Sequence, residues 1–366
     1  MDFVIPHFIE RIESAFPKDC ELSLVGGCVR DTILGKTPKD YDLVTNLKPD
    51  EIISVLEENN IPCDLIGKAF GIIFATIDRN TVEIATYRKD IDGHRETNVS
   101  FDADRKSDAE RRDFTINQIY YDLRSNEIID HFGGMNDLDN SILRCVGSAA
   151  KRIEEDPLRV YRAFRFANAL YLKFDDELEK ALRSFNGNSH FISNERVANE
   201  LQKIFFEGNG FVPLYCEVMQ PIFDQFCARS EYLYREGLSQ KPFVDFIANL
   251  SAAEVNYEKM LDVAKFSNLF VNTCKVLSVL HKVEKGQIKS EIAIPKIVHN
   301  NFKIEKKFLF YFAAAECYSK HNAFYKFLFF NPIIPSGECL MEKGLKGVQI
   351  GNAIKQAIAE QWEIIK

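Results

Sequence analysis

The residues of this 366-residue chain that could do chemistry begin in the stretch LVGGCVRDTILGKTPKDYDLVTN, residues 24–46. Asp40 and Asp42 are one residue apart there, and alternate side chains of a β-strand point the same way. Two adjacent carboxylates repel each other unless a cation lies between them. Two-metal phosphoryl transfer uses such carboxylates to hold Mg²⁺ ions roughly 3.5–4 Å apart. Glu83, an acid among apolar residues of another expected strand, is the natural third acidic residue.

A glycine pair, Gly26 and Gly27, ends one expected strand and opens the next expected helix. Backbone N–H groups at such a turn can bind an anion such as a triphosphate, and Arg30 can add positive charge. A solvated turn would explain the aspartates alone, and a tight turn would explain the glycines alone. Together they indicate a phosphate site ahead of a metal site, as in nucleotidyl transfer. A dinucleotide-binding fold would need G-x-G-x-x-G, whereas G-G-C-V-R-D lacks the third glycine.

The elements expected around these residues mix strands with helices, which indicates an α+β or α/β domain. Helices are expected at 3–16, 28–35 and 48–60, and strands at 21–27, 40–45, 62–67, 71–78 and 81–88. The charged segment 88–110 has almost no core-forming spacing and is expected to be a mobile loop. From about residue 147 onward, helical patterns dominate.

Composition sets further limits on the class of protein. The net charge of −8 argues against indiscriminate coating of nucleic acid, although a local basic face stays possible. Nine cysteines without a C-x-x-C pair indicate reduced thiols and a cytoplasmic location. The N-terminus is too charged for a signal peptide, and no apolar run approaches the roughly 18 residues of a membrane span. We therefore expect no membrane partner.

Two basic segments could face a nucleotide or RNA. Arg159, Arg162 and Arg165 recur every three residues on one expected helix, and no acid lies between Pro157 and Leu172 to balance them. A bound nucleotide or RNA backbone could supply the missing negative charge, and a solvated basic face is the alternative. Asp156 fits the N-cap of this helix. Further on, lysines outnumber acids, and they could follow an RNA backbone or form a solvated face. The RNA-binding candidates among them are Lys303, Lys306 and Lys307.

These residues resemble a known family, the nucleotidyltransferases typified by DNA polymerase beta. Within it they are similar to the class II CCA-adding enzymes and to the bacterial poly(A) polymerases. Five segments in order carry the resemblance: LVGGCVRD…KDYDLVT at 24–45, RRDFTINQIYYD at 111–122, IIDHFGGMNDLDNSILRCVG at 128–147, EEDPLRVYRAFRFA at 154–167 and ERVANELQKIF at 195–205. The segment at 337–362 is similar to a tail of many CCA-adding enzymes.

The resemblance implies an α+β fold, with a polymerase-beta-like head followed by an all-α neck, body and tail. The implied boundaries are 1–146 for the catalytic head, 147–206 for the neck that recognises the base, and 207–366 for the body and tail that bind tRNA. The implied reaction adds CCA to the 3′ end of tRNA from CTP and ATP, with Mg²⁺.

The resemblance also implies a role for individual residues. Asp40 and Asp42 would hold the metal, and Arg112 and Asp113 would engage the sugar. Asp156 and Arg159 would read the incoming base. The third segment, around Asp130 and the glycines at 133 and 134, would be a hinge, and 88–110 would be the loop needed to switch from C to A addition.

Three alternatives stay open at this point. A poly(A) polymerase would usually carry a basic G-R-R/K-F-x-L segment where this chain has IGKAFGIIF. An enzyme that adds only CC or only A is the second alternative, although the YRKDIDG in the loop favours the full reaction. The third is a non-catalytic RNA-binding relative, against which the intact aspartate pair argues. No His-Asp dipeptide is present, so the metal phosphohydrolase domain of some relatives is not expected.

Overall fold

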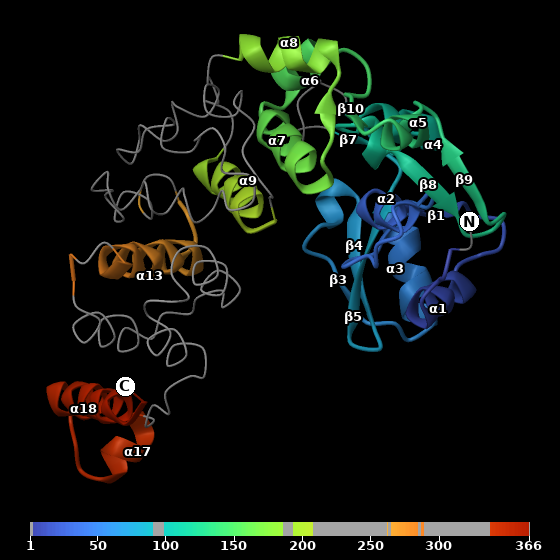
Figure 1. The fold of residues 1–366 in the computed structure, drawn as a ribbon. Helices are drawn as coiled ribbons and strands as arrows, with labels where there is room; N and C mark the ends of the chain where they lie inside the picture. Colours follow the sequence, from blue (N-terminus) through green and yellow to red (C-terminus); the bar gives the residue numbers. More distant parts are fainter. Residues whose placement is uncertain are drawn as a thin grey trace. The chain divides into compact units, whose positions relative to one another are not determined.

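The computed structural model describes residues 3–90, 99–185, 193–207, 262, 265–284, 287–288 and 337–365. The chain divides into two compact units, residues 1–185 and 186–366, which are considered separately. The first unit holds a mixed sheet with helices, and the described elements of the second are helices, so the predicted α+β class is confirmed (Figure 1). The predicted domain boundaries at 146 and 206 stay predictions.

A seven-stranded sheet organises the first unit, in the order β3-β4-β5-β2-β1-β8-β9. Its strands are β1 (Leu22–Val25), β2 (Asp42–Thr45), β3 (Cys63–Asp64), β4 (Ile72–Ile77), β5 (Asn80–Thr86), β8 (Ile119–Asp122) and β9 (Glu127–Asp130). β1 pairs antiparallel with both β2 and β8, whereas β2 and β5 run parallel. β2 is the central strand of the sheet, and its first residue, Asp42, lies at one end of that strand.

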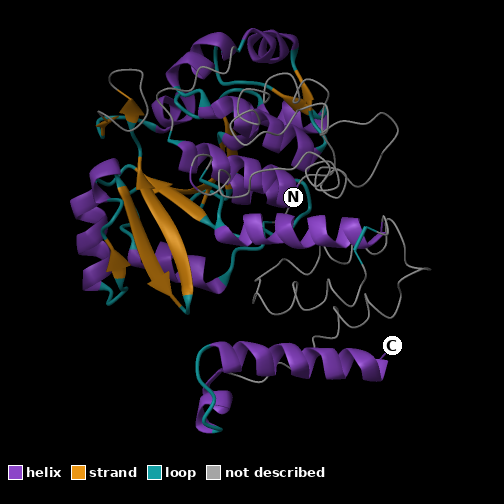
Figure 2. Ribbon diagram, turned by 90° about the vertical axis from the view of Figure 1, so that its left-hand side faces the viewer, coloured by secondary structure: helices purple, strands orange, loops and turns teal. Residues whose placement is uncertain are grey.

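The helices near the N-terminus pack against this sheet. α1 spans His7–Ala15, α2 spans Gly27–Ile33 and α3 spans Pro49–Glu58. α2 contacts β1 and β8, and α3 contacts β3, β4 and β5. Figure 2 shows the sheet with helices beside it. α1 begins later than predicted because Pro6, which lacks a backbone N–H, occupies the N-cap.

The predicted loop 88–110 is corrected in part. β6 (Lys89–Asp90) and β7 (Val99–Ser100) form a two-stranded antiparallel sheet, and α4 spans Arg105–Glu110. Asp104 caps α4 by accepting a hydrogen bond from the Ser107 backbone N–H at 2.8 Å. α4 buries Asp108 and Ala109, which a surface loop would leave in water. Residues 91–98 lie outside the described residues.

The chain then continues through short elements and helices. A 3₁₀ turn, η2, spans Thr115–Asn117 and is followed, after β9, by α5 (Gly134–Asp139), β10 (Ile142–Leu143), α6 (Ala149–Glu155), α7 (Leu158–Leu170), β11 (Lys173–Phe174) and α8 (Asp176–Ser184). β10 and β11 pair in parallel. α6 and α7 are separate helices because Asp156 is extended and the backbone N–H is missing at Pro157.

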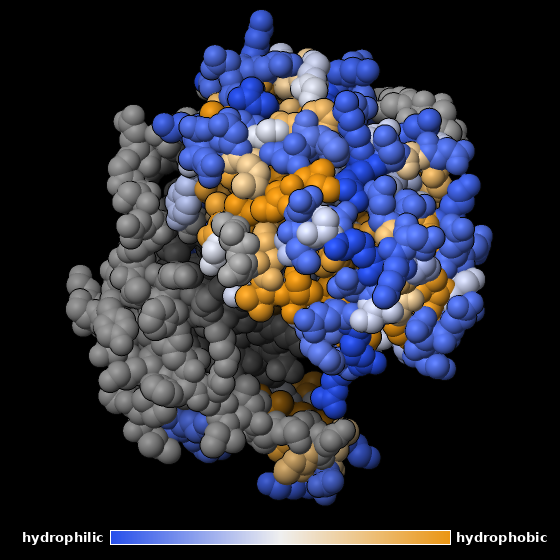
Figure 3. All heavy atoms as spheres, turned by 90° about the vertical axis from the view of Figure 1, so that its right-hand side faces the viewer, coloured by the Kyte–Doolittle hydropathy of each residue, from blue (hydrophilic) through white to orange (hydrophobic). Residues whose placement is uncertain are grey.

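The described part of the second unit is helical. Its longer helices are α9 (Asn194–Glu207), α13 (Asn268–Glu284) and α18 (Val348–Ile365), and the short α17 spans Gly337–Glu342. Lys303, Lys306 and Lys307 lie outside the described residues. Within the described ranges, no helix is both long and apolar enough to cross a membrane. Figure 3 shows hydrophilic side chains over much of the described surface of one face, with hydrophobic patches between them.

Candidate active site

Gly26 brings the predicted phosphate site and the predicted metal site together. Its φ of +76°, in the left-handed region, favours glycine at the turn between β1 and α2. A Cβ atom at this position would lie 3.9 Å from Nη1 of Arg112 and 4.0 Å from Oδ2 of Asp42. The bare backbone of Gly26 therefore faces a guanidinium and a carboxylate at once. Gly27 lies close to Arg30, whose Nη2 would be 3.7 Å from an added Cβ.

The predicted carboxylates are arranged around the start of β2. Asp42 is its first residue and lies opposite Glu83 in the parallel register with β5. Asp40 precedes the strand in an exposed bend, so the argument from strand alternation does not apply to it. Burial raises the pKa of the Asp42 carboxyl to about 6; the charge of Glu83 adds to the rise, that of Arg112 opposes it, and Asp40 raises it further. Negative charge is thus concentrated at Asp42.

The fit of a divalent cation to these carboxylates depends on how they are grouped. Among the described residues, no group of three or more His, Cys, Asp and Glu side chains is arranged to hold a metal ion. Mg²⁺, however, is usually bound through one or two carboxylates together with substrate phosphates. Asp42 fits such a shared site, because a cation would offset the repulsion from Glu83 and Asp40, which adds to the rise of its pKa caused by burial.

Arg112 is fixed beside this cluster. Its Nε and Nη2 donate hydrogen bonds to Oδ2 of Asp108 at 3.1 and 2.9 Å, and Nε also donates to the Tyr120 hydroxyl at 3.3 Å. Its guanidinium lies over the Tyr120 ring, 5.4 Å from the centroid. Burial alone would lower the pKa of Arg112, but the charge of Asp108 outweighs it and holds the group fully protonated.

Asp113 is the centre of a hydrogen-bonded chain across the unit. Its Oδ1 accepts from Nδ2 of Asn117 at 3.0 Å, and its Oδ2 accepts from Nε of Arg162 at 2.6 Å. Oδ1 of Asn117 accepts from Nη1 of Arg30 at 2.8 Å. Burial would raise the pKa of Asp113, but Arg162 and the hydrogen bonds hold it well below the usual value. The chain Arg30–Asn117–Asp113–Arg162 therefore links the glycine turn to α7.

The predicted base-reading pair lies at the start of α7. Oδ1 of Asp156 accepts a hydrogen bond from the Leu158 backbone N–H at 3.1 Å and so satisfies a donor of the first helical turn, although Pro157, and not Asp156 as predicted, occupies the N-cap. Nη1 of Arg159 donates to Oε2 of Glu155 at 3.1 Å, and its Nη2 donates to the Arg111 carbonyl at 3.2 Å. Asp156 and Arg159 are both buried, so their positions are set by the protein.

Two arginines of α7 have acidic partners within the protein, so the prediction that they need an outside partner is wrong for them. Arg159 pairs with Glu155 of α6, and Arg162 pairs with Asp113 at 2.6 Å. The acids come from outside α7, so inspection of that helix alone could not find them. Phe166 adds a second form of support: the guanidinium groups of Arg165, Arg30 and Arg162 lie 4.1, 5.2 and 5.3 Å from its ring centroid.

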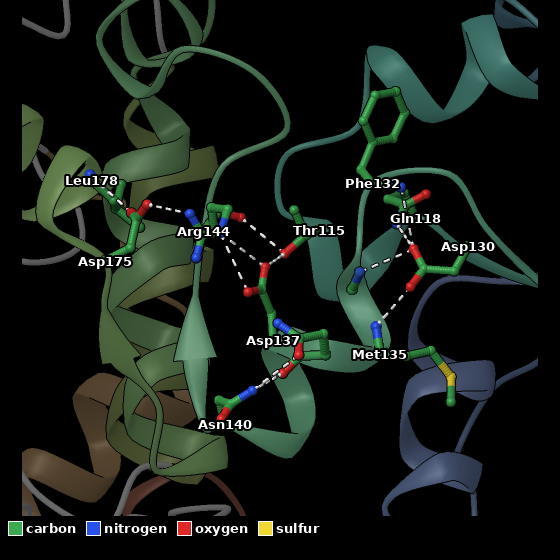
Figure 4. Close-up of polar contacts among 12 residues, drawn as sticks. Thr115, Gln118, Asp130, Phe132, Met135, Asp137, Asn140, Arg144, Asp175 and Leu178 are labelled. Carbon is green, nitrogen blue, oxygen red and sulfur yellow. Dashed lines mark hydrogen bonds and ion pairs between the residues drawn. The ribbon is translucent and has the colours of Figure 1, made fainter.

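The third predicted segment forms a dense set of hydrogen bonds (Figure 4). Oδ1 of Asp130 accepts from the Gly134 backbone N–H and from Nε2 of Gln118, and its Oδ2 accepts from the Met135 backbone N–H. A Cβ on Gly134 would lie only 2.1 Å from the Thr115 carbonyl oxygen. The hinge role of this segment stays a prediction.

A pocket of about 310 Å³ lies beside this segment, lined in part by Thr115, Arg144, Asp175 and Glu177. Arg144 bridges two acids there, Asp137 at 3.2 Å and Asp175 at 3.2 Å (Figure 4). As far as the described residues go, none of the predicted nucleotide-binding residues lines this pocket.

Sequence reasoning missed three residues that position the site: Asp108, Asn117 and Glu155. Asp108 stands three and four residues before Arg111 and Arg112, a spacing that pairs side chains on a helix. The high charge of segment 88–110, which predicts a loop, conceals that signal. Asn117 bonds to Asp113, four residues before it, but its other partner, Arg30, lies 87 residues away, so spacing alone could not show that it links the two.

Part of this chain is similar to proteins of known function. Residues 22–144 match the family model of the "Poly A polymerase head domain". Poly(A) polymerase I of Escherichia coli O157:H7 is 34% identical over 227 residues, which cover 56% of this chain and 46% of that protein. The CCA-adding enzyme of Staphylococcus aureus strain MRSA252 is 37% identical over 187 residues, covering 50% and 46%. The match thus spans about half the length of these curated relatives.

Solved structures give the same fold. The Bacillus stearothermophilus CCA-adding enzyme in complex with CTP has a TM-score of 0.63 and 21% identity, covering 98% of this chain and 91% of that chain. The Thermotoga maritima CCA-adding enzyme complexed with tRNA has a TM-score of 0.57 and 20% identity, covering 98% and 92%. Residues 22–144 of this chain are thus similar to the head domain of the poly(A) polymerases, and the chain shares its fold with CCA-adding enzymes of known structure.

Proposed function

We propose that this protein adds CCA to the 3′ end of tRNA without a nucleic-acid template, using CTP and ATP. The observation that carries the proposal is Gly26, whose open face lies about 4 Å from both the Asp42 carboxylate and the Arg112 guanidinium. A triphosphate there would meet backbone, positive charge and a metal-binding acid together. The relatedness to CCA-adding enzymes, and the solved relatives described with CTP and with tRNA, support the choice of substrates.

The reaction joins the tRNA 3′-oxygen to the α-phosphorus of the nucleotide and breaks the bond to the β-phosphate oxygen, so pyrophosphate leaves. Asp40 and Asp42 would hold Mg²⁺, with Glu83 beside them, and bound Mg²⁺ supplies charge stabilisation at the attacking and leaving oxygens. Gly26, Gly27, Arg30 and Arg112 would orient the triphosphate and sugar. Arg162 holds Asp113 in place for its predicted part in recognising ribose.

Base selection follows from the chemistry of Asp156 and Arg159. Cytosine and adenine present an amine donor beside a ring-nitrogen acceptor, whereas uracil and guanine present a carbonyl and an N–H. A carboxylate accepts and a guanidinium donates, so this pair matches C and A. With U or G, buried groups would stay unpaired at a cost of roughly 1–3 kcal/mol each. Arg162 and Arg165 would complete the nucleotide site.

The rest of the chain would bind tRNA. We keep the division into a head at 1–146, a neck at 147–206 and a body and tail at 207–366, with Lys303, Lys306 and Lys307 against the RNA backbone. The thiols of Cys20, Cys28, Cys63, Cys145 and Cys274 fit an enzyme of the reducing cytoplasm.

A second candidate function is poly(A) synthesis, favoured by the 34% identity to poly(A) polymerase I. An enzyme that adds only CC or only A is a narrower form of the first proposal. These reactions differ in their products: CCA addition stops after three nucleotides, whereas poly(A) synthesis extends a run of A from ATP alone.

The test is incubation of the full chain with tRNA that ends at its discriminator base, with Mg²⁺ and with CTP, ATP or both, followed by sequencing of the 3′ ends. We expect CC with CTP alone and CCA with both nucleotides, and Asp42→Ala as the inactive control. Long A runs with ATP alone would support the poly(A) alternative. No addition to any RNA would overturn both.

A further inference from the structure

We propose that Asp108 is a positioning residue that aims Arg112 at the incoming nucleotide. The inference rests on the proposed nucleotidyl transfer and adds to it a residue outside the predicted site. Asp108 lies on α4, in the segment expected to be a loop, and its side chain is fully buried. A buried carboxylate is costly unless its charge is balanced and its oxygens accept hydrogen bonds, and the contacts of Asp108 meet both conditions.

Both oxygens of Asp108 are occupied, and each serves a different arginine. Oδ1 accepts from Nε and Nη2 of Arg111 at 2.9 and 2.6 Å. Oδ2 accepts from Nε and Nη2 of Arg112 at 3.1 and 2.9 Å, and from the Tyr120 hydroxyl at 2.9 Å. Because two N–H groups of each guanidinium converge on one charged oxygen, each arginine is held by the edge that carries Nε and Nη2.

These contacts orient the Arg112 guanidinium toward the proposed nucleotide site. Asp108 engages the Nε and Nη2 edge of Arg112, which leaves the Nη1 corner pointing away from Asp108. Nη1 is the atom that lies 3.9 Å from the position of a Cβ on Gly26. Arg112 therefore presents one N–H corner to the same space that Asp42 borders. A freely rotating arginine would lose conformational entropy when it binds the anion, and its affinity for the anion would be lower.

Asp108 also braces the neighbouring arginine. The Arg111 guanidinium donates to Asp108 and, through Nε, to the Arg88 carbonyl at 3.0 Å. The Arg111 carbonyl in turn accepts from Nη2 of Arg159 at 3.2 Å. One buried carboxylate thus supports the arginine beside Asp42 directly and the backbone that holds Arg159 indirectly.

The test compares Asp108→Asn with a matched control, Asp122→Asn, in the full chain. Asn keeps the shape of the side chain but turns one acceptor oxygen into an N–H donor that faces an arginine. Asp122 is also a buried carboxylate paired with an arginine, Arg105 at 2.7 Å, but it ends β8 rather than facing Gly26. The readouts are equilibrium binding of CTP by calorimetry and the melting temperature.

We expect Asp108→Asn to weaken CTP binding about tenfold or more, because charge-assisted hydrogen bonds to the arginine are lost. Asp122→Asn should leave CTP binding within about twofold while lowering the melting temperature. In an Arg112→Leu background, Asp108→Asn should add little further loss, since the residue it positions is gone. A carboxylate with only a structural role would not show this dependence on Arg112.

Tyr120→Phe keeps the test decisive if Asp108→Asn does not fold. It removes one hydrogen bond to Asp108 and should weaken CTP binding about threefold, again only when Arg112 is present. Two results would overturn the inference. One is unchanged CTP binding in whichever of the two variants folds, and the other is an equal further loss of CTP binding when that substitution is made in the Arg112→Leu background. A wild-type chain that binds no CTP would instead overturn the proposed function, which separates the two failures.

Discussion

Asp42 is a predicted metal ligand whose carboxyl is unfavourable to ionise in the folded protein. Burial, the carboxylate of Glu83 across the parallel register and Asp40 outside the strand raise its pKa to about 6, against an ordinary value of 3.8. The folded protein therefore binds a proton at Asp42 at a pH where the unfolded chain has released it. The contribution of this group to stability is fully present below pH about 4 and is lost as the pH rises through about 6.

Asp42→Asn should accordingly abolish nucleotide addition and stabilise the metal-free protein. At pH 8 we expect the free energy of unfolding to rise by about 1–2 kcal/mol, because the variant avoids ionising a partly buried carboxyl. Near pH 4 the difference should disappear. Urea unfolding with a chelator at both pH values measures it, and an equal gain at pH 4 and pH 8 would mean that charge is not the cause.

Asp156→Ala and Arg159→Ala should lose selectivity as well as rate. Without the acceptor or the donor, U and G no longer leave a buried group unpaired, so discrimination against UTP and GTP should fall about tenfold or more. Competition assays with all four nucleotides measure this change. Asp175→Ala is the matched control, because Asp175 also caps a helix, through the Leu178 N–H at 3.0 Å, without a predicted role in base recognition.

If both variants became slow but stayed specific for C and A, Asp156 would act only as a helix cap. The reader of the base would then lie elsewhere. A loss of selectivity in Asp175→Ala of the same size would point to general loosening of the helices instead.

At the scale of elements, the sequence predicts a helix best where a single local feature marks its first residue. The glycine turn after β1, and Pro49 at the start of α3, mark their helices directly. It failed in 88–110, where polar residues concealed α4, because the apolar contacts that stabilise a short helix come from distant residues. It failed likewise for the arginines of α7, whose partners Glu155 and Asp113 lie outside that helix.

Gly134, the first residue of α5, packs so closely against the Thr115 backbone that it leaves no room for a side chain. Gly134→Ala should destabilise the protein by about 3 kcal/mol or more, because a Cβ would lie 2.1 Å from the Thr115 carbonyl and backbone would have to move. Gly133→Ala is the control: it has a positive φ of 76° but nothing within 4 Å, so we expect a loss of only about 1 kcal/mol.

The midpoints of urea unfolding, with unchanged slopes, measure both variants. Equal losses in the two would mean that the segment moves aside readily, as a hinge would. A much larger loss at Gly134 would mean that α5 and the Thr115 turn behave as one rigid piece.

At the scale of the molecule, the proposed chemistry lies within one compact unit. Gly26, Asp42, Arg112, Asp156 and Arg159 all belong to residues 1–185. We expect a fragment that ends at Phe185 to unfold cooperatively and to bind CTP within a few-fold of the full chain, while binding tRNA far more weakly. Circular dichroism melting and calorimetry, with the full chain as control, measure this. An unfolded fragment would mean that the unit depends on the remaining residues.

The place of β1 in the sheet has a consequence for synthesis on the ribosome. β1 is hydrogen-bonded on one side by β2, which follows closely, and on the other by β8, which begins only at Ile119. During translation one edge of this apolar strand therefore stays without its partner strand for about 5–20 s at ordinary elongation rates. An open, hydrophobic strand edge is a template for pairing with other chains. The nascent chain is thus exposed to aggregation through this strand edge, and can benefit from a chaperone, until Asp122 has left the exit tunnel.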